Sequence, residues 1–168
     1  MLMRAKVEDV NDPLNLGRIK VRIYGFHDGI PVEDLPWAEP CFILGGEKDY
    51  GVFTVPRVGS TVWVSFEVDD TFEPDPNCIV YLGTWYGSGE EPIEADQDKK
   101  IIIKTSNKNK IIISDKAGEE GILIQDRNGN KIEIKTDNGN IVIYAKGDML
   151  IQAEGNMTLK ANRIDLNP

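Results

Sequence analysis

The residues best suited to chemistry form a run of carboxylates, in which Glu67, Asp69, Asp70, Glu73 and Asp75 stand close together. Oxygen ligands at this density could hold Ca²⁺, and a pair of carboxyl groups could act as acid and base on a glycoside. Their spacing matches no calcium-binding loop, and no feature of the sequence places an acid near a base. We therefore expect a solvated hairpin loop between two strands.

The single histidine, His27, lies beside Asp28 and Gly29, so a general base is conceivable. No serine or cysteine elbow accompanies it, and we expect a turn histidine. One histidine also excludes a His-rich metal cluster within one chain. Gly45-Gly46 is followed by Glu47 and lacks the lysine of a phosphate-binding loop. The sequence therefore predicts no catalytic residue, no metal ligand and no cofactor.

Composition narrows the possible functions further. Residues 1–98 carry 7 basic and 19 acidic side chains, whereas residues 99–168 carry 12 basic and 9 acidic ones, and this acidic first part argues against nucleic-acid binding. Cys41 and Cys78 show no metal-ligand spacing, so both are expected to be buried free thiols. The chain has no apolar run of membrane-spanning length, and its first residues do not resemble a secretion signal.

Short strands broken by turn residues fill the first half. Ile19, Val21 and Ile23 alternate with basic residues, the period of a strand with one wet face, and Val62, Val64 and Phe66 repeat the pattern. Several such strands in fewer than ninety residues predict a small closed barrel of the OB type. The expected strands are 4–10, 17–24, 37–44, 52–55, 61–68 and 79–82.

The second half is a series of repeats. We expect the barrel to end at residue 88, an acidic exposed linker to span 89–98, and the repeats to occupy 99–168. From residue 141 the period is eight, with Gly147 and Gly155 at corners that call for positive φ. The expected apolar strands are 101–103, 111–113, 122–124, 132–134, 141–143, 149–151, 157–159 and 164–166.

Each of these strands is too short to bury its apolar face alone, and a single ribbon would expose two unpaired edges. The repeat therefore predicts an intertwined triple-stranded β-helix in which three identical chains share one core. A single-chain meander packed on the barrel is the alternative, although residues 99–168 contain one aromatic residue, Tyr144, to cover it. The expected core residues are Ile141, Ile143, Met149, Ile151, Met157 and Leu159.

Several segments resemble the central spike proteins of contractile-tailed phages and the VgrG proteins of type VI secretion. Residues 7–23, which include Gly17 and Arg18, are similar to the opening strands of that family's OB barrel. Leu35-Pro36-Trp37 resembles the segment leading into its third strand. Residues 55–66, with Pro56 and Gly59, resemble its Pro-Arg-hydrophobic-Gly turn, and residues 79–87, with Gly83, resemble its closing strand. Together with the octad repeat, the resemblance covers nearly the whole chain.

This resemblance implies a non-enzymatic, all-β homotrimer in which an OB-fold barrel is followed by a β-helical needle. Such a spike would join a tail-tube hub above the barrels, receive a PAAR-like tip protein on the needle, and make transient contact with the target membrane. The expected location is the tail baseplate of a virion or a related particle. The linker is too short to hold a lysozyme domain, and the C-terminal residues lack the histidines of iron-tipped spikes.

Two other functions remain open. A monomeric OB-fold binder of oligonucleotide or oligosaccharide could use Tyr81, Trp85 and Tyr86 as a stacking platform, although basic residues are missing beside them. A cell-wall hydrolase is disfavoured by the missing catalytic spacing. The sequence does not separate a phage tail from a tailocin, an extracellular injection particle or a secretion system, but the short chain without large hub domains favours a phage-derived particle.

Overall fold

The computed structural model describes residues 1–68, 71 and 73–166, and these divide into two compact units. Met1–Glu91 is called the barrel unit and Pro92–Pro168 the C-terminal unit. The described residues form strands, turns and two short 3₁₀ helices, η1 (Val32–Asp34) and η2 (Gln97–Lys99), and no α-helix. The chain is thus all-β, as the sequence predicts.

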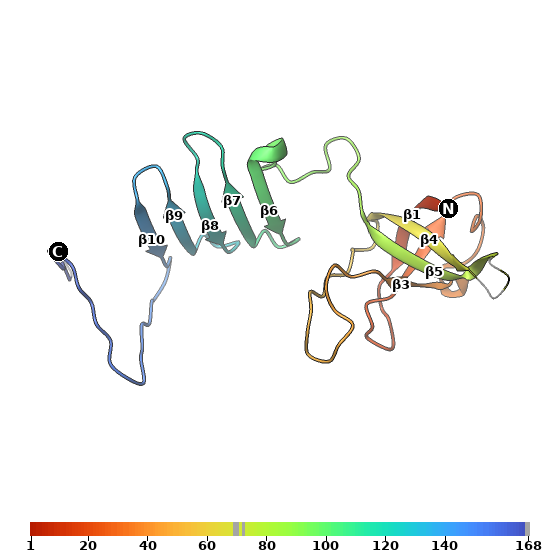
Figure 1. Cartoon of the computed structure of the whole chain (residues 1–168), viewed down its shortest axis with the longest axis horizontal. Helices are drawn as coiled ribbons and strands as arrows, with labels where there is room; N and C mark the ends of the chain where they lie inside the picture. Colours follow the sequence, from red (N-terminus) through yellow and green to blue (C-terminus); the bar gives the residue numbers. More distant parts are fainter. Residues whose placement is uncertain (69–70, 72, 167–168) are drawn as a thin grey trace. The chain divides into compact units, whose positions relative to one another are not determined.

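The barrel unit is a closed five-stranded barrel with the strand order β1-β2-β3-β5-β4 (Figure 1). Strands β3 and β5 pair in parallel, and all other neighbours, including the closing pair β1 and β4, are antiparallel. This closure removes the free sheet edges and matches the predicted OB-type barrel. The strands are β1 (Leu2–Asp9), β2 (Ile19–Ile23), β3 (Trp37–Pro40), β4 (Thr61–Val68) and β5 (Pro74–Thr84).

Alternating apolar residues fill the barrel. Ile19, Val21 and Ile23 of β2 are buried, as are Val62 and Val64 of β4. Phe66, the third member of the β4 series, is partly buried and packs against this core. The period of two in the sequence therefore marks the inward face of both strands correctly.

Two expectations for the barrel unit are wrong. Strand β3 ends at Pro40, and residues 52–55 form no strand, because the chain between β3 and β4 leaves the barrel as a long loop. Cys41 and Cys78 are free, as expected, but both are exposed. Cys41 follows the end of β3, and Cys78 lies in an exposed stretch of β5, so neither side chain enters the core.

The C-terminal unit contains a five-stranded antiparallel meander in which each strand pairs with the next along the chain (Figure 1). Gly129 (φ 98°) and Gly139 (φ 67°) supply the left-handed backbone of the turns on either side of β9. The strands are β6 (Lys100–Lys104), β7 (Lys110–Ser114), β8 (Gly121–Gln125), β9 (Lys131–Lys135) and β10 (Asn140–Tyr144).

Residues 145–166 form no strand in the single chain, so strands at 149–151, 157–159 and 164–166 are absent from it. Gly147 and Gly155 lie at bends, but neither has φ in the left-handed region, which corrects the expectation of positive φ there. The physical reason is that a strand needs a hydrogen-bonding neighbour, and no other segment of the described chain runs beside these residues as a strand.

Candidate assembly surface

One face of the C-terminal sheet consists of isoleucine alone, and we call it the isoleucine face. Each of its five strands contributes two isoleucines, and the register places them directly opposite those of the next strand, in two continuous rows. The first row is Ile101, Ile113, Ile122, Ile134 and Ile141, and the second is Ile103, Ile111, Ile124, Ile132 and Ile143.

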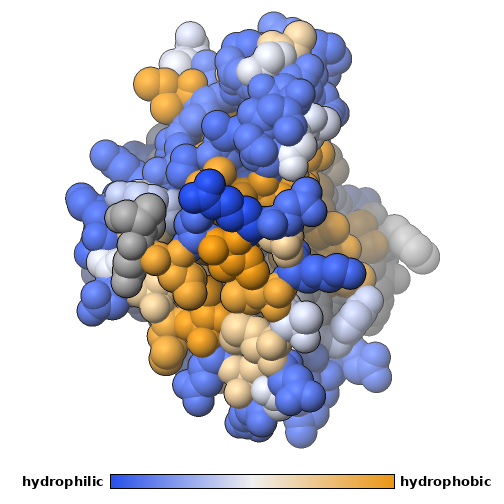
Figure 2. All heavy atoms as spheres, turned by 90° about the vertical axis from the view of Figure 1, so that its left-hand side faces the viewer, coloured by the Kyte–Doolittle hydropathy of each residue, from blue (hydrophilic) through white to orange (hydrophobic). Residues whose placement is uncertain are grey.

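The isoleucine face is open to solvent in the single chain. Its members range from 38% exposed at Ile111 and Ile122 to 68% at Ile141. Figure 2 shows hydrophobic residues gathered together on the side of the molecule that it displays, next to an area of hydrophilic ones. Burying the exposed part of these ten side chains would contribute on the order of 10 kcal/mol per chain, at about 1 kcal/mol each. An open apolar face of this size marks an association surface.

The opposite face, which we call the lysine face, is less exposed along its central row than the isoleucine face. Its central row holds Ile112, which is 8% exposed, and the half-buried Leu123 and Val142. Lysines at the strand ends flank this row, and their aliphatic stems cover apolar surface while their ammonium groups remain near water. The contrast between the two faces indicates which one requires a partner.

Glu94 binds two lysines of the lysine face. Lys104 and Lys110 stand directly opposite each other on β6 and β7, where two like charges would repel. The Glu94 carboxylate accepts hydrogen bonds from Lys104 Nζ at 2.7 and 2.9 Å and from Lys110 Nζ at 3.2 Å. The Lys104 hydrogen bond is the main cause that lowers the pKa of Glu94 to about 2. This residue of the predicted linker is thus bound to the C-terminal sheet.

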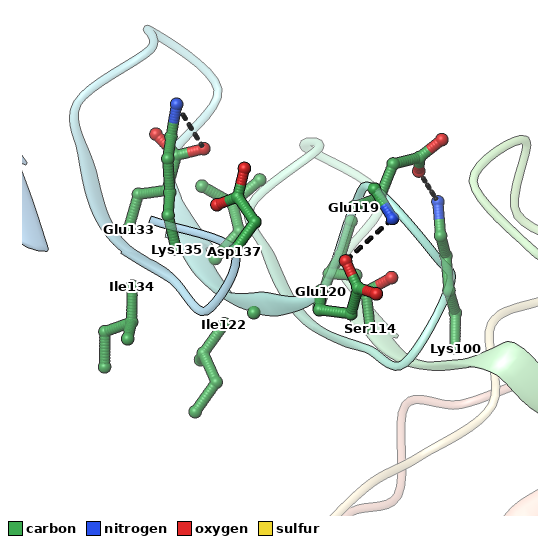
Figure 3. A pocket seen from close by; sticks show the side chains of 13 residues that line it. Lys100, Ser114, Glu119, Glu120, Ile122, Glu133, Ile134, Lys135 and Asp137 are labelled. Atoms are coloured by element: carbon green, nitrogen blue, oxygen red, sulfur yellow. Dashed lines mark hydrogen bonds and ion pairs between the residues drawn. The ribbon is translucent and has the colours of Figure 1, made fainter. Parts of the chain in front are cut away.

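A cavity of about 330 Å³ lies at the other end of the strands (Figure 3). Two of its carboxylates are bound by lysines: Lys100 Nζ donates to Glu119 at 2.6 Å, and Glu133 lies 2.7 Å from Lys131 and 4.0 Å from Lys135. Lys100 lowers the pKa of Glu119, and Lys131 lowers that of Glu133. Because lysines hold Glu119 and Glu133 in their charged form, neither carboxylate is suited to act as a general acid.

Arg18 binds the carboxylate of Asp12, which the sequence alone indicates only as part of a turn. Asp12 is buried, and it accepts hydrogen bonds from the backbone N–H groups of Leu14, Leu16 and Arg18. Its Oδ1 also accepts hydrogen bonds from Arg18 Nη2 at 2.7 Å and Nε at 3.1 Å. These hydrogen bonds are the main reason that the pKa of Asp12 lies far below its usual range. The Arg18 guanidinium lies 5.4 Å from the Trp37 ring centroid.

Gly17, Gly59 and Gly83, which lie in the segments that resemble the spike family, have backbone roles. Gly17 (φ 80°) has no room for a side chain, because a Cβ would lie 2.8 Å from Phe42 Cζ. In the turn that begins at Pro56, the Gly59 N–H donates to Val7 O at 2.8 Å and so ties the turn to β1. Gly83 (φ 146°) pairs with Trp63 at a bulge of β5. These residues shape the barrel and do not converge on a common site.

His27 has a structural role in the described geometry. Its side chain is buried, and Nδ1 lies 3.1 Å from the carbonyl oxygen of Val21 and 3.3 Å from the backbone nitrogen of Ile23. Both neighbours are backbone groups of β2. The carboxylate run at 67–75 lies partly outside the described residues, since Asp69 and Asp70 belong to the part that is not described.

The three aromatic residues proposed as a stacking platform do not form one. Tyr81 points into the barrel core, where its hydroxyl donates to Gly17 O at 2.7 Å and burial raises its pKa to about 12. Trp85 is covered on its ring by Arg4, whose guanidinium carbon lies 4.5 Å from the ring centroid. Tyr86 is exposed and is not among the ring contacts of the described residues.

Two further properties of the described residues bear on chemistry and location. No group of three or more His, Cys, Asp and Glu side chains in that part of the chain is placed to hold a metal ion. None of the helices found there is long and apolar enough to cross a membrane.

Comparison with known proteins identifies both units. Residues 3–86 match the model of the type VI secretion system and phage-baseplate injector OB domain, and residues 100–167 match that of the phage baseplate V C-terminal trimerisation domain. A search of curated proteins finds no match. The second match covers the strands that carry the isoleucine face. The chain therefore belongs to the family of phage-baseplate and type VI secretion spike proteins, which are structural parts of the injection apparatus.

Proposed function

We propose that three copies of this chain assemble through their isoleucine faces into the central spike of a contractile injection machine, and that the resulting shaft pierces the target membrane. The observation that carries the proposal is the pair of isoleucine rows, which are open in the single chain, whereas Ile112 at the centre of the opposite face is 8% exposed. The match to a trimerisation domain over the same residues supports three copies as the number. Three sheets can enclose one dry core between them.

The octad segment completes the shaft in this proposal. Its apolar residues are exposed in the single chain: Met149 and Met157 are each 48% exposed, Ile151 68% and Leu159 69%. Strands from neighbouring copies would supply the hydrogen-bonding partners that one chain lacks, with Gly147 and Gly155 at the corners between them. Ile141 and Ile143 would join this core at its upper end.

The activity we propose is mechanical. A strand shared among three chains cannot leave without disrupting its neighbours, so unfolding is slow and the shaft withstands force. The barrels would be held by a tail-tube hub, a PAAR-like tip protein would sit on the other end, and the complex would belong to the baseplate of a phage or related particle. We propose no enzymatic step, and lysines hold Glu119 and Glu133 of the described cavity in their charged form.

Substitution of one isoleucine tests the shared core. Ile122→Asp would place three carboxylates in a dry core, and burial of unpaired charge costs several kcal/mol for each. We expect it to convert a trimer into chains of 18.8 kDa when mass is measured by light scattering. Ile93→Asp is the matched control, because Ile93 is 92% exposed and lies outside the isoleucine face. If Ile122→Asp retained the mass of the unmodified protein, the isoleucine face would not be the contact.

A further inference from the structure

Two loops of the barrel unit form an apolar groove that the barrel itself does not need. The 41–54 loop and the 12–18 turn together line a cavity of about 470 Å³ and protrude from the same side of the barrel (Figure 1). Exposed apolar side chains border it on both loops. They are Leu16 (51% exposed), Leu44 (44%), Tyr50 (57%), Val52 (47%) and Phe53 (64%).

Both loops are held in place by specific contacts. Asp12 fixes the 12–18 turn through three backbone N–H groups. The Phe42 and Phe53 rings lie 5.2 Å apart at the base of the 41–54 loop and pack over Gly17. Farther out, Val52 N donates to Leu44 O at 2.9 Å. A groove whose walls are already ordered loses little entropy when a partner binds.

The charge around the groove identifies the kind of partner. Two exposed acidic residues, Glu47 and Asp49, line the cavity beside the apolar side chains, and the exposed Lys48 between them is not part of the lining. The barrel unit as a whole carries 16 acidic and 7 basic residues, whereas the C-terminal unit carries 12 of each. The full negative charge of the molecule therefore lies in the barrel unit. Neither unit of this chain offers an excess of positive charge to complement Glu47 and Asp49, so a basic surface has to come from a different protein.

We propose that this groove is the docking site for a different protein chain, which inserts apolar side chains flanked by Lys or Arg. Leu16, Leu44 and Tyr50 supply the apolar contact, and Glu47 and Asp49 pair with the basic residues around it. This inference rests on the proposed function in one respect: a spike that transmits force must be fastened to the machine, and the barrel unit carries no part of the isoleucine face through which the copies would assemble.

Photo-crosslinking in the assembled particle tests this site. A photoreactive phenylalanine analogue replaces Tyr50, and in a control chain it replaces Tyr24, which is 64% exposed elsewhere on the barrel. We expect position 50 to yield a covalent adduct with a peptide of another protein that contains Lys or Arg next to apolar residues, and position 24 to yield none with that peptide. An adduct with a second copy of this chain, or no adduct at position 50, would overturn the proposal.

Charge reversal tests the electrostatic part separately. Glu47→Lys/Asp49→Lys should lower the yield of the position 50 adduct at least tenfold, whereas Glu33→Lys/Asp34→Lys, with the same charge change on exposed residues of η1, should leave it unchanged. Equal yields from both double variants would refute charge pairing. The mass of the isolated protein reports on the trimer independently, so a monomer that still forms the adduct would contradict the spike and leave the docking site standing.

Discussion

At the scale of single residues, a few backbone contacts decide whether the sheets can form. Gly121 begins β8 with φ 148°, and a Cβ at this position would clash with the carbonyl oxygen of Ile134 on β9. Such a contact requires the two strands to separate. Gly118 also has positive φ, 79°, but a Cβ there would meet nothing within 4 Å. Substitution of Gly118 therefore tests the cost of positive φ alone, whereas substitution of Gly121 tests that cost together with a steric clash.

We predict that Gly121→Ala destabilises the C-terminal unit by about 2–4 kcal/mol, because it adds a backbone clash to the cost of an unfavourable φ. Gly118→Ala should cost about 1 kcal/mol, the backbone term alone. Chemical denaturation of the two variants and the unmodified protein measures the difference. Equal losses of unfolding free energy would mean that β8 and β9 do not approach as closely at Gly121 as described.

Asp12 shows what sequence reading misses at this scale. The Asp12-Pro13 pair indicates a turn, but a turn residue does not reveal that its carboxylate will bind three backbone N–H groups and Arg18. The spacing from Asp12 to Arg18 carries a weak signal, because an acidic residue shortly before Gly-Arg could have suggested an ion pair. The contact depends on how the loop closes, which local composition does not specify.

At the scale of elements, the segment 92–99 is bound to the first strands of the C-terminal unit. Glu94 joins Lys104 and Lys110, and Lys116 lies 3.3 Å from Asp96 and 3.0 Å from Glu119. The acidic composition of this segment predicts an exposed linker. Composition does not distinguish a solvated acidic segment from one whose carboxylates bind lysines of a neighbouring sheet. Lys104 and Lys110, which bind Glu94, lie 10 and 16 residues after it in the chain. Local sequence patterns do not report contacts at this separation.

We predict a pH dependence from this segment. The pKa of Glu94 is lowered from 4.5 to about 2 in the folded chain, so the stability it contributes is present above about pH 4.5 and is lost as the pH falls toward 2. Glu94→Gln should melt at a lower temperature than the unmodified protein at pH 6, and the difference should disappear near pH 2. Thermal melting across this range, followed by circular dichroism, measures it. A constant difference at all pH values would contradict the ion pairs.

Strand patterns were the most predictable elements. Alternation identified β2 and β4 of the barrel and the isoleucine repeats of β6 to β10, because a period of two directly reports which face is apolar. The strands expected at 149–151, 157–159 and 164–166 are missing from the single chain for a physical reason. Their hydrogen-bonding partners would have to come from other copies, and an apolar repeat does not state which chain supplies its neighbour.

At the scale of the whole molecule, the proposed function depends on the number of chains. One chain leaves two rows of isoleucine and the octad segment exposed, whereas three chains can cover both and leave the lysine faces outside. The charge distribution fits this arrangement, since the C-terminal unit is balanced while the barrel unit is acidic. A balanced C-terminal unit can pack closely against its copies without strong electrostatic repulsion.

The most direct test is the molar mass of the unmodified protein in solution, measured by size-exclusion chromatography with light scattering and repeated after exposure to SDS without heating. We predict a species of three times 18.8 kDa that persists in SDS, because dissociation would require strands shared among the chains to separate. A stable species of 18.8 kDa over the same concentration range would contradict the shared isoleucine core and with it the proposed spike.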